Sequence, residues 1–423
     1  MSNVLVVGNG AREHALCYAL QRSPGLTSLR CAPGNAGTSR LAENVTVALD
    51  DAEQILRVAR ERPTDLVIVG PEVPLAAGVA DGLREFGILT VGPGRAAAQI
   101  ESSKAWAKEL MRGIGVPTAR AIVVTSHAAA RQAVDQVGFP AVIKADGLAA
   151  GKGVTVAANQ LEAEAALDEL FVQRALGGAA DTVVVEEFLD GRELSVLAFC
   201  DGERLAVLPA ARDYKAAYDG GLGPNTGGMG AYSRPRSATP GLLARVRVEI
   251  LEPVVKELAR RGAPFVGVLY AGLMLTSTGP KVIEFNCRFG DPEAQVILPL
   301  LESDFLETML ATASGALDPS SLTWSDDTLC GVVLTAGGYP GAYATGRQID
   351  GLERAPSDVL VFQAGTRERE DGAVVTAGGR VLTVVGRGTT LDDARVRAYA
   401  GAAAISFEGE RHRQDIGDED VPK

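Results

Sequence analysis

The sequence predicts a mixed α/β and α+β protein of several domains, and three observations support this. In the first 100 residues, apolar strands alternate with helical patterns, which is typical of an open parallel α/β domain. From about Gly115 the pattern changes to strands grouped around one expected helix, which indicates an α+β lobe. From about Gly331 the chain is rich in glycine turns and β-branched residues, which predicts a β-rich domain with one helix near Leu391 to Ala404.

The first domain is predicted over residues 1–100. Its strands are expected at Val4 to Val7, Asp65 to Gly70 and Leu89 to Gly92, with helices from about Arg12 and near Gly78 to Phe86. Apolar strands separated by helices form a parallel sheet that is covered on both faces. Ligands of such sheets bind at the carboxyl edge of the strands, and residues 33–37 and 70–72 follow strands at that edge.

The second domain is predicted over residues 101–325, with a lid lobe at about 115–190. The lobe is expected to contain strands at Ala141 to Lys144, Val154 to Ala157 and Val183 to Val185, and a helix at Leu161 to Leu170. Residues 190–325 add antiparallel strands, including a hairpin in which Leu269 to Leu275 and Lys281 to Phe285 flank a turn. The third domain is predicted over residues 326–423, and its tail, residues 417–423, looks disordered.

Composition excludes several classes of protein. The net charge of −12, from 41 basic and 53 acidic residues, argues against a general nucleic-acid or membrane-surface binder. The five cysteines are scattered without a Cys-x-x-Cys spacing, so neither a disulfide framework nor a zinc site is expected, and a cytoplasmic location fits. No targeting segment precedes the first strand and no long apolar run follows it, so no membrane association is expected. Three histidines leave little capacity for a hydrolytic triad.

The segment 281–293 contains candidate metal ligands. Side chains alternate along a strand, so Glu284 and Asn286 are predicted to share one face with Val282, while Ile283 and Phe285 share the other. A carboxylate and an amide oxygen side by side are the hard ligands that Mg²⁺ prefers when it also holds nucleotide phosphates. The alternative is a polar strand end with a solvated glutamate.

Two further segments indicate anion binding. Arg288 provides a guanidinium fork for a phosphate or carboxylate just after the candidate metal ligands. Residues 8–13 turn from the first strand into a helix, where the glycines would let backbone amides approach an anion. The third glycine of a dinucleotide fingerprint is replaced by Glu13, and no acidic residue follows for the ribose, so NAD is not expected. A lone phosphate beside Arg12 is favoured, and ordinary glycine-rich turns are the alternative.

The middle of the chain contains a loop pattern suited to phosphates. Lys144 lies on a strand and Lys152 in a glycine-rich loop that does not match a Walker A sequence. Residues 223–232 are too rich in glycine for a helix or central strand, which predicts a loop close to a ligand, with Asp213 and Lys215 just upstream. Metal ligands, lysines and glycine loops without an obvious nucleophile or base suit phosphoryl transfer.

Six segments in order resemble the phosphoribosylamine–glycine ligase (glycinamide ribonucleotide synthetase) family of the ATP-grasp superfamily, over nearly the whole chain. They are GNGAREH at 8–14, PGNAGT at 33–38, KADGLAAGKGV at 144–154, GPNTGGMGAY at 223–232, EFNCRFGDPE at 284–293 and RQDIG at 413–417. The resemblance implies a two-lobe ATP-grasp site, with Glu284 and Asn286 holding Mg²⁺ or Mn²⁺. It implies that ATP is bound by Lys104, Lys144, Glu186, Glu187, Phe188, Leu189, Glu193, Lys215 and Asn225.

The resemblance also implies a reaction and its substrate residues. Glycine and 5-phosphoribosylamine would give glycinamide ribonucleotide, ADP and phosphate through glycyl phosphate, in purine biosynthesis. Arg288 and Lys152 are the expected catalytic residues. The expected substrate residues are Asn9, Gly10, Arg12, Glu13, Asn35, Gly37, Glu72, Asp213 and Arg288. A transient contact with the enzyme that supplies phosphoribosylamine is a further expectation.

One departure from the family pattern and two alternatives stay open at this point. Many members have Asp-His-Lys followed by a cation, whereas this chain has Asp213-Tyr214-Lys215-Ala216, so either Lys215 substitutes or nucleotide binding is weaker. Another ATP-grasp ligase or a biotin-dependent carboxylase shares the nucleotide machinery, although the sequence contains no Met-Lys-Met biotin segment. A catalytically silent nucleotide sensor is the alternative from a different class.

Overall fold

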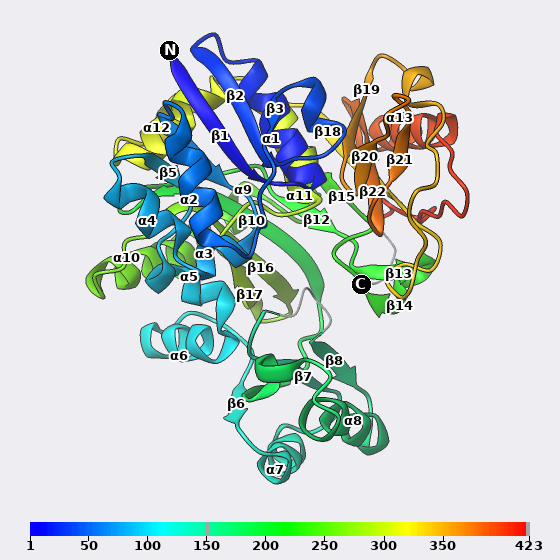
Figure 1. The fold of residues 1–423 in the computed structure, drawn as a ribbon. Helices are drawn as coiled ribbons and strands as arrows, with labels where there is room; N and C mark the ends of the chain where they lie inside the picture. The colour runs from blue at the N-terminus through cyan, green and yellow to red at the C-terminus, as the bar shows by residue number, and fades with distance from the viewer. Residues whose placement is uncertain (149–152, 420–423) are drawn as a thin grey trace.

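The computed structural model describes residues 1–148 and 153–419, and its N-terminal part is an open parallel sheet, as predicted (Figure 1). The strands lie in the order β3–β2–β1–β4–β5, and every neighbouring pair is parallel. Their bounds are β1 Ser2–Gly8, β2 Leu26–Pro33, β3 Glu43–Asn44, β4 Leu66–Val69 and β5 Leu89–Val91.

Helices cover both faces of this sheet because its strands carry apolar side chains on both faces. Val4 and Val6 of β1 pack in the cluster that contains α1, whereas Leu5 and Val7 pack in the cluster that contains α2 and α4. The helix bounds are α1 Ala11–Gln21, α2 Ala52–Glu61, α3 Glu72–Ala76, α4 Val79–Glu85 and α5 Arg95–Ser102. The carboxyl ends of β1, β2 and β4 therefore meet at one open edge.

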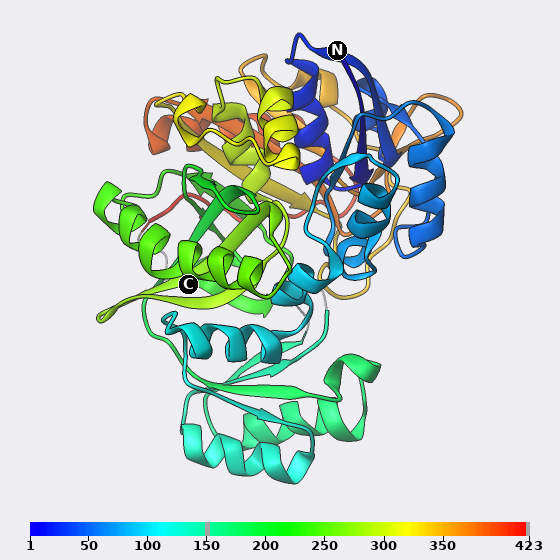
Figure 2. The same cartoon turned by 90° about the vertical axis from the view of Figure 1, so that its left-hand side faces the viewer.

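The lid lobe is a four-stranded antiparallel sheet with two helices, and it projects from the rest of the molecule (Figures 1 and 2). The strand order is β6–β9–β7–β8, and one apolar cluster joins the sheet to α7 and α8. The bounds are β6 Ala121–Val124, β7 Ala141–Ala145, β8 Val154–Ala157, β9 Val183–Glu187, α7 His127–Val137 and α8 Gln160–Leu167. Helix α6, Lys104–Ile114, leads from the N-terminal domain to this lobe.

A nine-stranded sheet forms the centre of the molecule and is antiparallel at each of its pairings. Its order is β17–β16–β10–β12–β15–β18–β22–β19, with β11 paired to β10, so the sheet crosses the expected domain boundary at residue 326. The bounds are β10 Arg192–Asp201, β11 Leu205–Val207, β12 Ala211–Asp213, β15 Gly230–Ser233, β16 Val266–Thr276, β17 Gly279–Asn286, β18 Thr328–Thr335, β19 Val359–Gln363 and β22 Arg380–Gly388.

The expectation that residues 223–232 form only a loop is wrong. Residues 222–225 pair with β13 in a small hairpin, and residues 230–233 form β15 in the middle of the central sheet. A side chain at Gly230 would lie 2.6 Å from the carbonyl oxygen of Gly331 on β18, so glycine permits this close strand approach. The glycines that argued against a strand are thus partly a packing requirement of the strand.

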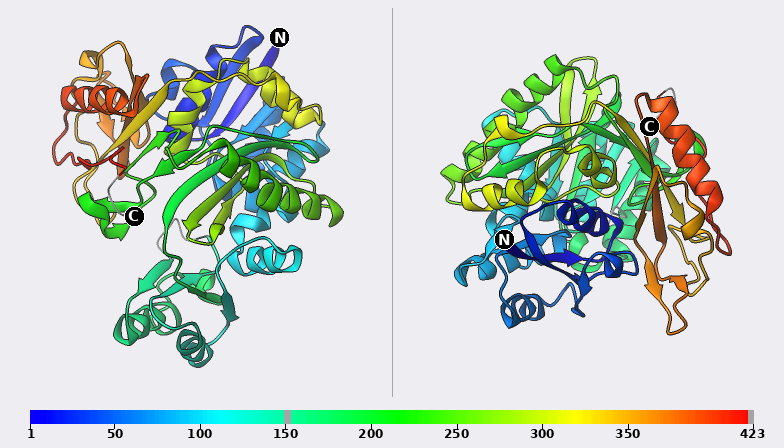
Figure 3. Two further views of the ribbon diagram at one scale, coloured as in Figure 1. Left: turned by 180° about the vertical axis from the view of Figure 1, so that it is seen from behind. Right: turned by 90° about the horizontal axis from the view of Figure 1, so that it is seen from above.

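The C-terminal part adds a helix and one small strand pair, β20–β21, beside the edge of the central sheet (Figure 3). The expected helix is α13, Leu391–Ala404, and it packs on β18 and β22. The remaining bounds are α9 Pro240–Val246, α10 Glu252–Arg260, α11 Glu293–Ile297, α12 Phe305–Ser314, β13 Ala216–Tyr218, β14 Leu222–Asn225, β20 Thr366–Glu368 and β21 Val374–Thr376. Within the described ranges, no helix has the length and apolar character needed to span a bilayer.

The first residues of the tail are docked, contrary to the expectation of a disordered segment from residue 417 onward. The carbonyl oxygen of Asp418 accepts a hydrogen bond from the Tyr214 hydroxyl at 2.9 Å. The carboxylate of Glu419 pairs with Arg236 at 3.0 Å and accepts a hydrogen bond from the Tyr232 hydroxyl. Specific polar contacts therefore hold residues that the charged composition alone made appear unstructured. Residues 420–423 lie outside the described residues.

Candidate nucleotide and metal site

The candidate metal ligands Glu284 and Asn286 lie on β17, in the hairpin that it forms with β16. They are two residues apart in a regular stretch of the pairing, so their side chains share one face, as predicted. The carboxylate of Glu284 makes no hydrogen bond or ion pair with any residue in the ranges 1–148 and 153–419. Oδ1 of Asn286 accepts a hydrogen bond from Arg288 at 3.2 Å.

The predicted grouping of the other side chains on this strand is wrong, because β17 contains a bulge. Glu284 is paired with Gly272 and Val282 with Leu273, so Ile283 has no partner on β16. The bulge places Val282 in the same apolar core as Phe285, rather than beside Glu284. Ile283 packs in a small separate cluster. Strict alternation could not show this extra residue.

The donor set at Glu284 and Asn286 fits a divalent cation that completes its coordination with phosphate and water oxygens. Mg²⁺ is held in this way in many nucleotide sites, with only one or two protein ligands. No group of three or more histidine, cysteine, aspartate or glutamate side chains that could hold a metal ion occurs among the described residues. The carboxylate of Glu284 also acts electrostatically on Lys104 and Lys215, which favours the charged form of both lysines.

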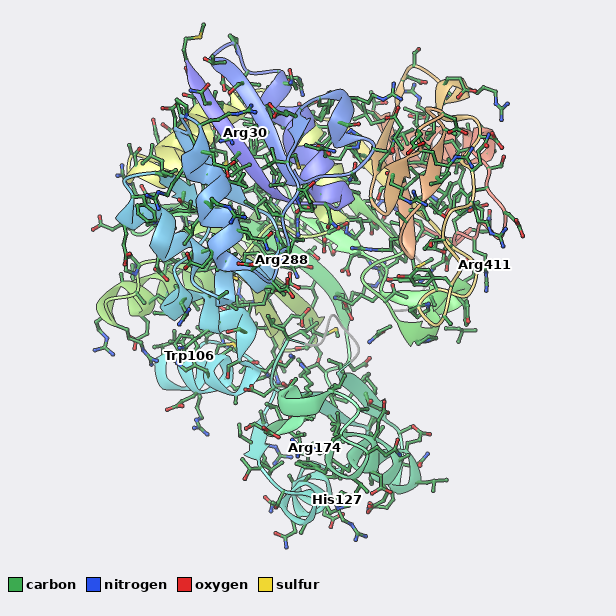
Figure 4. All side chains as sticks on the ribbon, in the orientation of Figure 1. Arg30, Trp106, His127, Arg174, Arg288 and Arg411 are labelled. Atoms are coloured by element: carbon green, nitrogen blue, oxygen red, sulfur yellow. The ribbon has the colours of Figure 1, made fainter. Side chains whose placement is uncertain are left out.

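Arg288 lies in the middle of the molecule and is held by two carboxylates (Figure 4). Its guanidinium is 3.2 Å from Glu72 and 2.9 Å from Glu101. Burial opposes the charged form, but Glu101 and Glu72 outweigh it, so the pKa of Arg288 is raised. Arg288 thus contacts the substrate candidate Glu72 and a second carboxylate, Glu101, that was not expected.

Lys144 of β7 is buried and paired with Glu186 of β9. Its Nζ lies 3.1 Å from Oε2 of Glu186 and donates to the carbonyl oxygen of Ile283 at 3.2 Å, so the bulge of β17 supplies one of its acceptors. A second lysine, Lys108 of α6, lies at the same distance from Oε2. Oε1 of Glu186 is buried and has no hydrogen-bond partner among the described residues. The site therefore contains one unsatisfied acceptor of the kind that a ligand amino group satisfies.

The other predicted nucleotide residues lie at the start of α6 and at the end of β9. Nζ of Lys104 donates to the carbonyl oxygen of Gly147 at 3.2 Å, and burial lowers the pKa of this lysine. Glu187 accepts from the backbone of Arg120 and pairs with Lys281. Phe188 and Leu189 follow directly on β9, with Phe188 more exposed than Leu189. The expected catalytic residue Lys152 lies outside the described residues.

A second polar cluster lies on β10, β12 and β16 and surrounds Lys215. Nζ of Lys215 is 2.9 Å from Glu193 and 3.4 Å from Asp213, which brings three of the predicted residues together. Burial raises the pKa of Asp213 to about 7, with Lys215 acting in the opposite direction. The hydroxyl of Ser195 connects Asp213 to Glu293, the first residue of α11, which was not predicted as a site residue. These groups form a partly buried hydrogen-bonded chain near residues 282–288, which are termed here the metal strand.

Position 216, where a cation was expected, lies on β13. The carbonyl oxygen of Ala216 accepts a hydrogen bond from Arg413 at 3.0 Å, so a guanidinium contacts the backbone there. Arg413 is itself paired with Asp415. Asn225 is exposed at the end of β14, and no side-chain hydrogen bond joins it to the rest of the site within the described residues. Its backbone pairs with Ala216 on β13, and the amide of the next residue, Thr226, donates to the carbonyl oxygen of Lys215 at 2.8 Å, so Asn225 lies near the nucleotide candidate Lys215.

Residues 8–13, termed here the N-terminal turn, hold an anion that belongs to the chain itself. The carboxylate of Glu13 accepts a hydrogen bond from the backbone of Gly10 at 2.6 Å and pairs with Arg12 at 2.6 Å. A methyl group at Gly8 or Gly70 would overlap this carboxylate. The glycines of the turn thus leave room for Glu13. The predicted phosphate beside Arg12 stays a prediction; the anion that the structure places at the amide of Gly10 is Glu13.

Asn35 and Gly37 are drawn into the same region by hydrogen bonds. Nδ2 of Asn35 donates to the carbonyl oxygens of Asn9, at 2.9 Å, and of Gln363 in the C-terminal domain, at 2.8 Å. Oδ1 of Asn35 accepts from the backbone of Gly37. Asn35 therefore ties the N-terminal turn to the C-terminal domain.

The N-terminal turn and the metal strand meet at one carbonyl group. Arg12 and Arg288 both donate a hydrogen bond to the carbonyl oxygen of Phe289, each at 3.2 Å. The substrate candidates of the first domain and the candidate metal ligands are therefore adjacent, although 277 residues separate Arg12 from Phe289 in the sequence.

Three functional candidates, Glu101, Lys108 and Glu293, were missed from the sequence. Glu101 and Lys108 lie on helices α5 and α6, where charged residues are usually solvated, and Glu293 ends a segment that resembles the family but had no assigned role itself. The available signal was weak: Lys108 follows Lys104 by one helical turn, which places both on one face.

Sequence models of one family match most of the chain. Family models described as phosphoribosylglycinamide synthetase match residues 2–101 (N domain), 102–294 (ATP-grasp domain) and 329–419 (C domain). A phosphoribosylamine–glycine ligase of Nostoc is 50% identical over 98% of both chains. The chain belongs to the phosphoribosylamine–glycine ligase family. A Streptomyces coelicolor phosphoribosylamine–glycine ligase is 49% identical, again over 98% of both chains.

Solved structures share this fold. The crystal structure of a phosphoribosylamine–glycine ligase from Thermotoga maritima has a TM-score of 0.86 and 34% identity, covering 98% of this chain and all of that one. The biotin carboxylase domain of a Hydrogenobacter thermophilus 2-oxoglutarate carboxylase, solved with MgADP, shares the fold with a TM-score of 0.75 at 17% identity. The match covers 97% of this chain and 92% of that chain. Membership of the family makes the chain a ligase that forms carbon–nitrogen bonds with an ATP-grasp nucleotide site.

Proposed function

We propose that this chain joins glycine to 5-phosphoribosylamine, giving glycinamide ribonucleotide, ADP and phosphate in purine biosynthesis. The observation that carries the proposal is the adjacency of Glu284, Asn286 and Arg288 to the N-terminal turn, in a chain that matches the family from end to end. This arrangement provides oxygen ligands for a metal and a guanidinium beside a separate group of polar residues for the second substrate.

The described residues fit MgATP, with Mn²⁺ as the alternative cation. Glu284 and Asn286 would hold the metal, which neutralises phosphate charge when bound. Lys104 and Lys144 would bind the phosphates, and Glu193 the ribose. The buried Oε1 of Glu186 lacks a donor, and the amino group of adenine is a donor of the required kind.

A glycyl phosphate intermediate accounts for the lack of a protein nucleophile in the described part of the site. An oxygen of the glycine carboxylate would form a bond to the γ-phosphorus while the bond to ADP breaks. The amine nitrogen would then attack the acyl carbon, and phosphate would leave. Cys287 lies between Asn286 and Arg288, but burial and the adjacent Glu101 raise the pKa of its thiol well above the usual value, which suppresses the nucleophilic thiolate.

The phosphoribosyl group is assigned to the N-terminal turn and to Asn35, Gly37 and Glu72. Arg12 supports this assignment, because its guanidinium lies at the junction with the metal strand. Glu13 would act by fixing Arg12 and Gly10, since its carboxylate is already bound by both. Asp213 would contact glycine from the cluster around Lys215.

The test is the fate of the glycine oxygens. Glycine labelled with ¹⁸O in its carboxylate is expected to give labelled inorganic phosphate when ATP and phosphoribosylamine are present, because phosphate leaves with one carboxylate oxygen. Other amino acids in place of glycine provide the matched control for substrate identity. Unlabelled phosphate from a reaction that still forms the amide contradicts the intermediate, and the absence of glycine-dependent ADP release contradicts the ligase activity and favours a nucleotide sensor.

A further inference from the structure

Lys108 is a buried lysine that the proposed chemistry does not use. Its side chain is 8% exposed, and its Nζ lies 3.1 Å from Oε2 of Glu186, whose side chain is 3% exposed. Nζ also donates a hydrogen bond to the Thr118 hydroxyl at 2.7 Å, and that hydroxyl donates to the carbonyl oxygen of Val282 at 2.7 Å. One ammonium group thus connects α6, β9 and the bulged end of β17.

Two lysines share one oxygen of Glu186. Lys144 lies at 3.1 Å from the same Oε2 that Lys108 contacts, and it also donates to the carbonyl oxygen of Ile283. A nucleotide phosphate, as a second anion, would compete with this carboxylate for Lys144. If it were the sole partner, its departure would leave a buried carboxylate without a compensating charge, which is strongly unfavourable. A second cation that stays in place removes this obstacle.

We propose that Lys108 is a positioning residue of the nucleotide site, which holds the Glu186 carboxylate so that Lys144 is released to the nucleotide phosphates. Both contacts of Lys108 are to protein groups, Glu186 and Thr118, so it acts through Lys144 and Glu186 rather than on the nucleotide. It also keeps Glu186 oriented with its unsatisfied Oε1 available to a donor. The inference rests on the proposed binding of ATP at this site.

The charges around Lys108 make the arrangement dependent on pH. Burial lowers the pKa of Lys108 to about 8; Glu186 acts against this, Lys144 acts with it, and Glu187 acts against it. Lys104 lies one turn earlier on the same helix. As the pH rises through about 8, Lys108 loses its proton and Glu186 retains Lys144 as its cation. The affinity for the nucleotide is therefore expected to be highest below pH 8 and to fall as the pH rises above 8.

Lys108 lies on α6, and this helix, marked by Trp106 in Figure 4, lies between the body of the molecule and the lid lobe. MgATP is titrated calorimetrically into the whole chain without glycine or phosphoribosylamine, at pH 7 and pH 9. Lys108→Met is expected to weaken binding by roughly tenfold at pH 7, because Glu186 then retains Lys144. Lys108→Arg, which keeps its charge at both pH values, is expected to bind as the unchanged protein does at pH 7 and to show no decline at pH 9.

The matched control is Lys281→Met, because Lys281 of β17 forms a more exposed ion pair, at 3.4 Å, with Glu187, the residue next to Glu186 on β9. This variant is expected to follow the unchanged protein at both pH values. Equal affinity of Lys108→Met and the unchanged protein would overturn the inference, as would equal weakening in the Met and Arg variants. If Lys108→Met does not fold, the loss of the pH 9 decline in Lys108→Arg decides the question. An unchanged protein that does not bind MgATP contradicts the proposed function itself, and the inference with it.

Discussion

The metal strand, residues 282–288, and the N-terminal turn are both short polar segments next to glycines, yet their polar groups are in different states. Glu284 on the metal strand has no hydrogen-bond or ion-pair partner among the described residues. In the N-terminal turn, Glu13 is bound by Arg12 and by the backbone of Gly10. A buried group that is satisfied by its own chain contributes to stability, whereas an acceptor left without a donor is available to a ligand. Mutations in the two segments should therefore affect different measurements.

The largest effect is expected for Glu13→Ala, which breaks a buried ion pair and removes the acceptor of the Gly10 amide. The free energy of unfolding should fall by about 3–5 kcal/mol, because Arg12 is left buried without its partner. Urea denaturation measures this change. Glu43→Ala, which removes the exposed ion pair with Arg62 in the same domain, is the control and should leave stability almost unchanged. A stable Glu13→Ala protein that has lost only activity would reverse the comparison.

Glu284→Ala should show the opposite pattern, with turnover reduced roughly 10²-fold or more and folding preserved. The estimate corresponds to the removal of one electrostatic element at a developing charge. Steady-state ADP release at several Mg²⁺ concentrations measures the loss, and a thermal melt checks the fold. Near-normal activity at limiting Mg²⁺ would exclude Glu284 as a metal ligand.

His14 directly follows the N-terminal turn and is buried. Burial lowers the pKa of His14 to about 4, and Nδ1 accepts a hydrogen bond from the backbone of Gln363 at 2.8 Å. In the unfolded chain His14 binds a proton as the pH falls below about 6.5, whereas in the folded chain it does so only near pH 4. Its contribution to the free energy of unfolding is therefore fully present above pH 6.5 and is lost as the pH falls toward 4. The loss at pH 5 should be roughly 2 kcal/mol. Denaturation of His14→Asn, which retains an acceptor but does not titrate, should show a flatter dependence between pH 7 and pH 5; an equal slope in both proteins would contradict the assignment.

The sequence was sufficient to predict the fold class and to place Glu284 and Asn286 on one face of a strand, because both predictions depend on local periodicity. It was insufficient where an effect depends on a second segment. The bulge at Ile283 appears only in the pairing with β16, and Gly230 is explained only by the carbonyl of Gly331 on a neighbouring strand. Glu101 and Lys108 lie on helices and become functional candidates only because distant carboxylates and cations face them.

The smallest effect is expected for the substitution Glu72→Gln. Glu72 follows a strand of the N-terminal sheet, but it contacts the metal strand through Arg288. Arg288 retains Glu101 at 2.9 Å, so its charge stays paired, and the free energy of unfolding should fall by only about 1 kcal/mol. Turnover should fall by less than roughly tenfold, because the guanidinium keeps one of its two carboxylate contacts and loses part of its orientation. Denaturation and steady-state kinetics on the same preparation separate the two outcomes. A stability loss as large as that of Glu13→Ala with unchanged kinetics would assign Glu72 to the N-terminal turn, whereas a kinetic change at nearly constant stability assigns it to the metal strand.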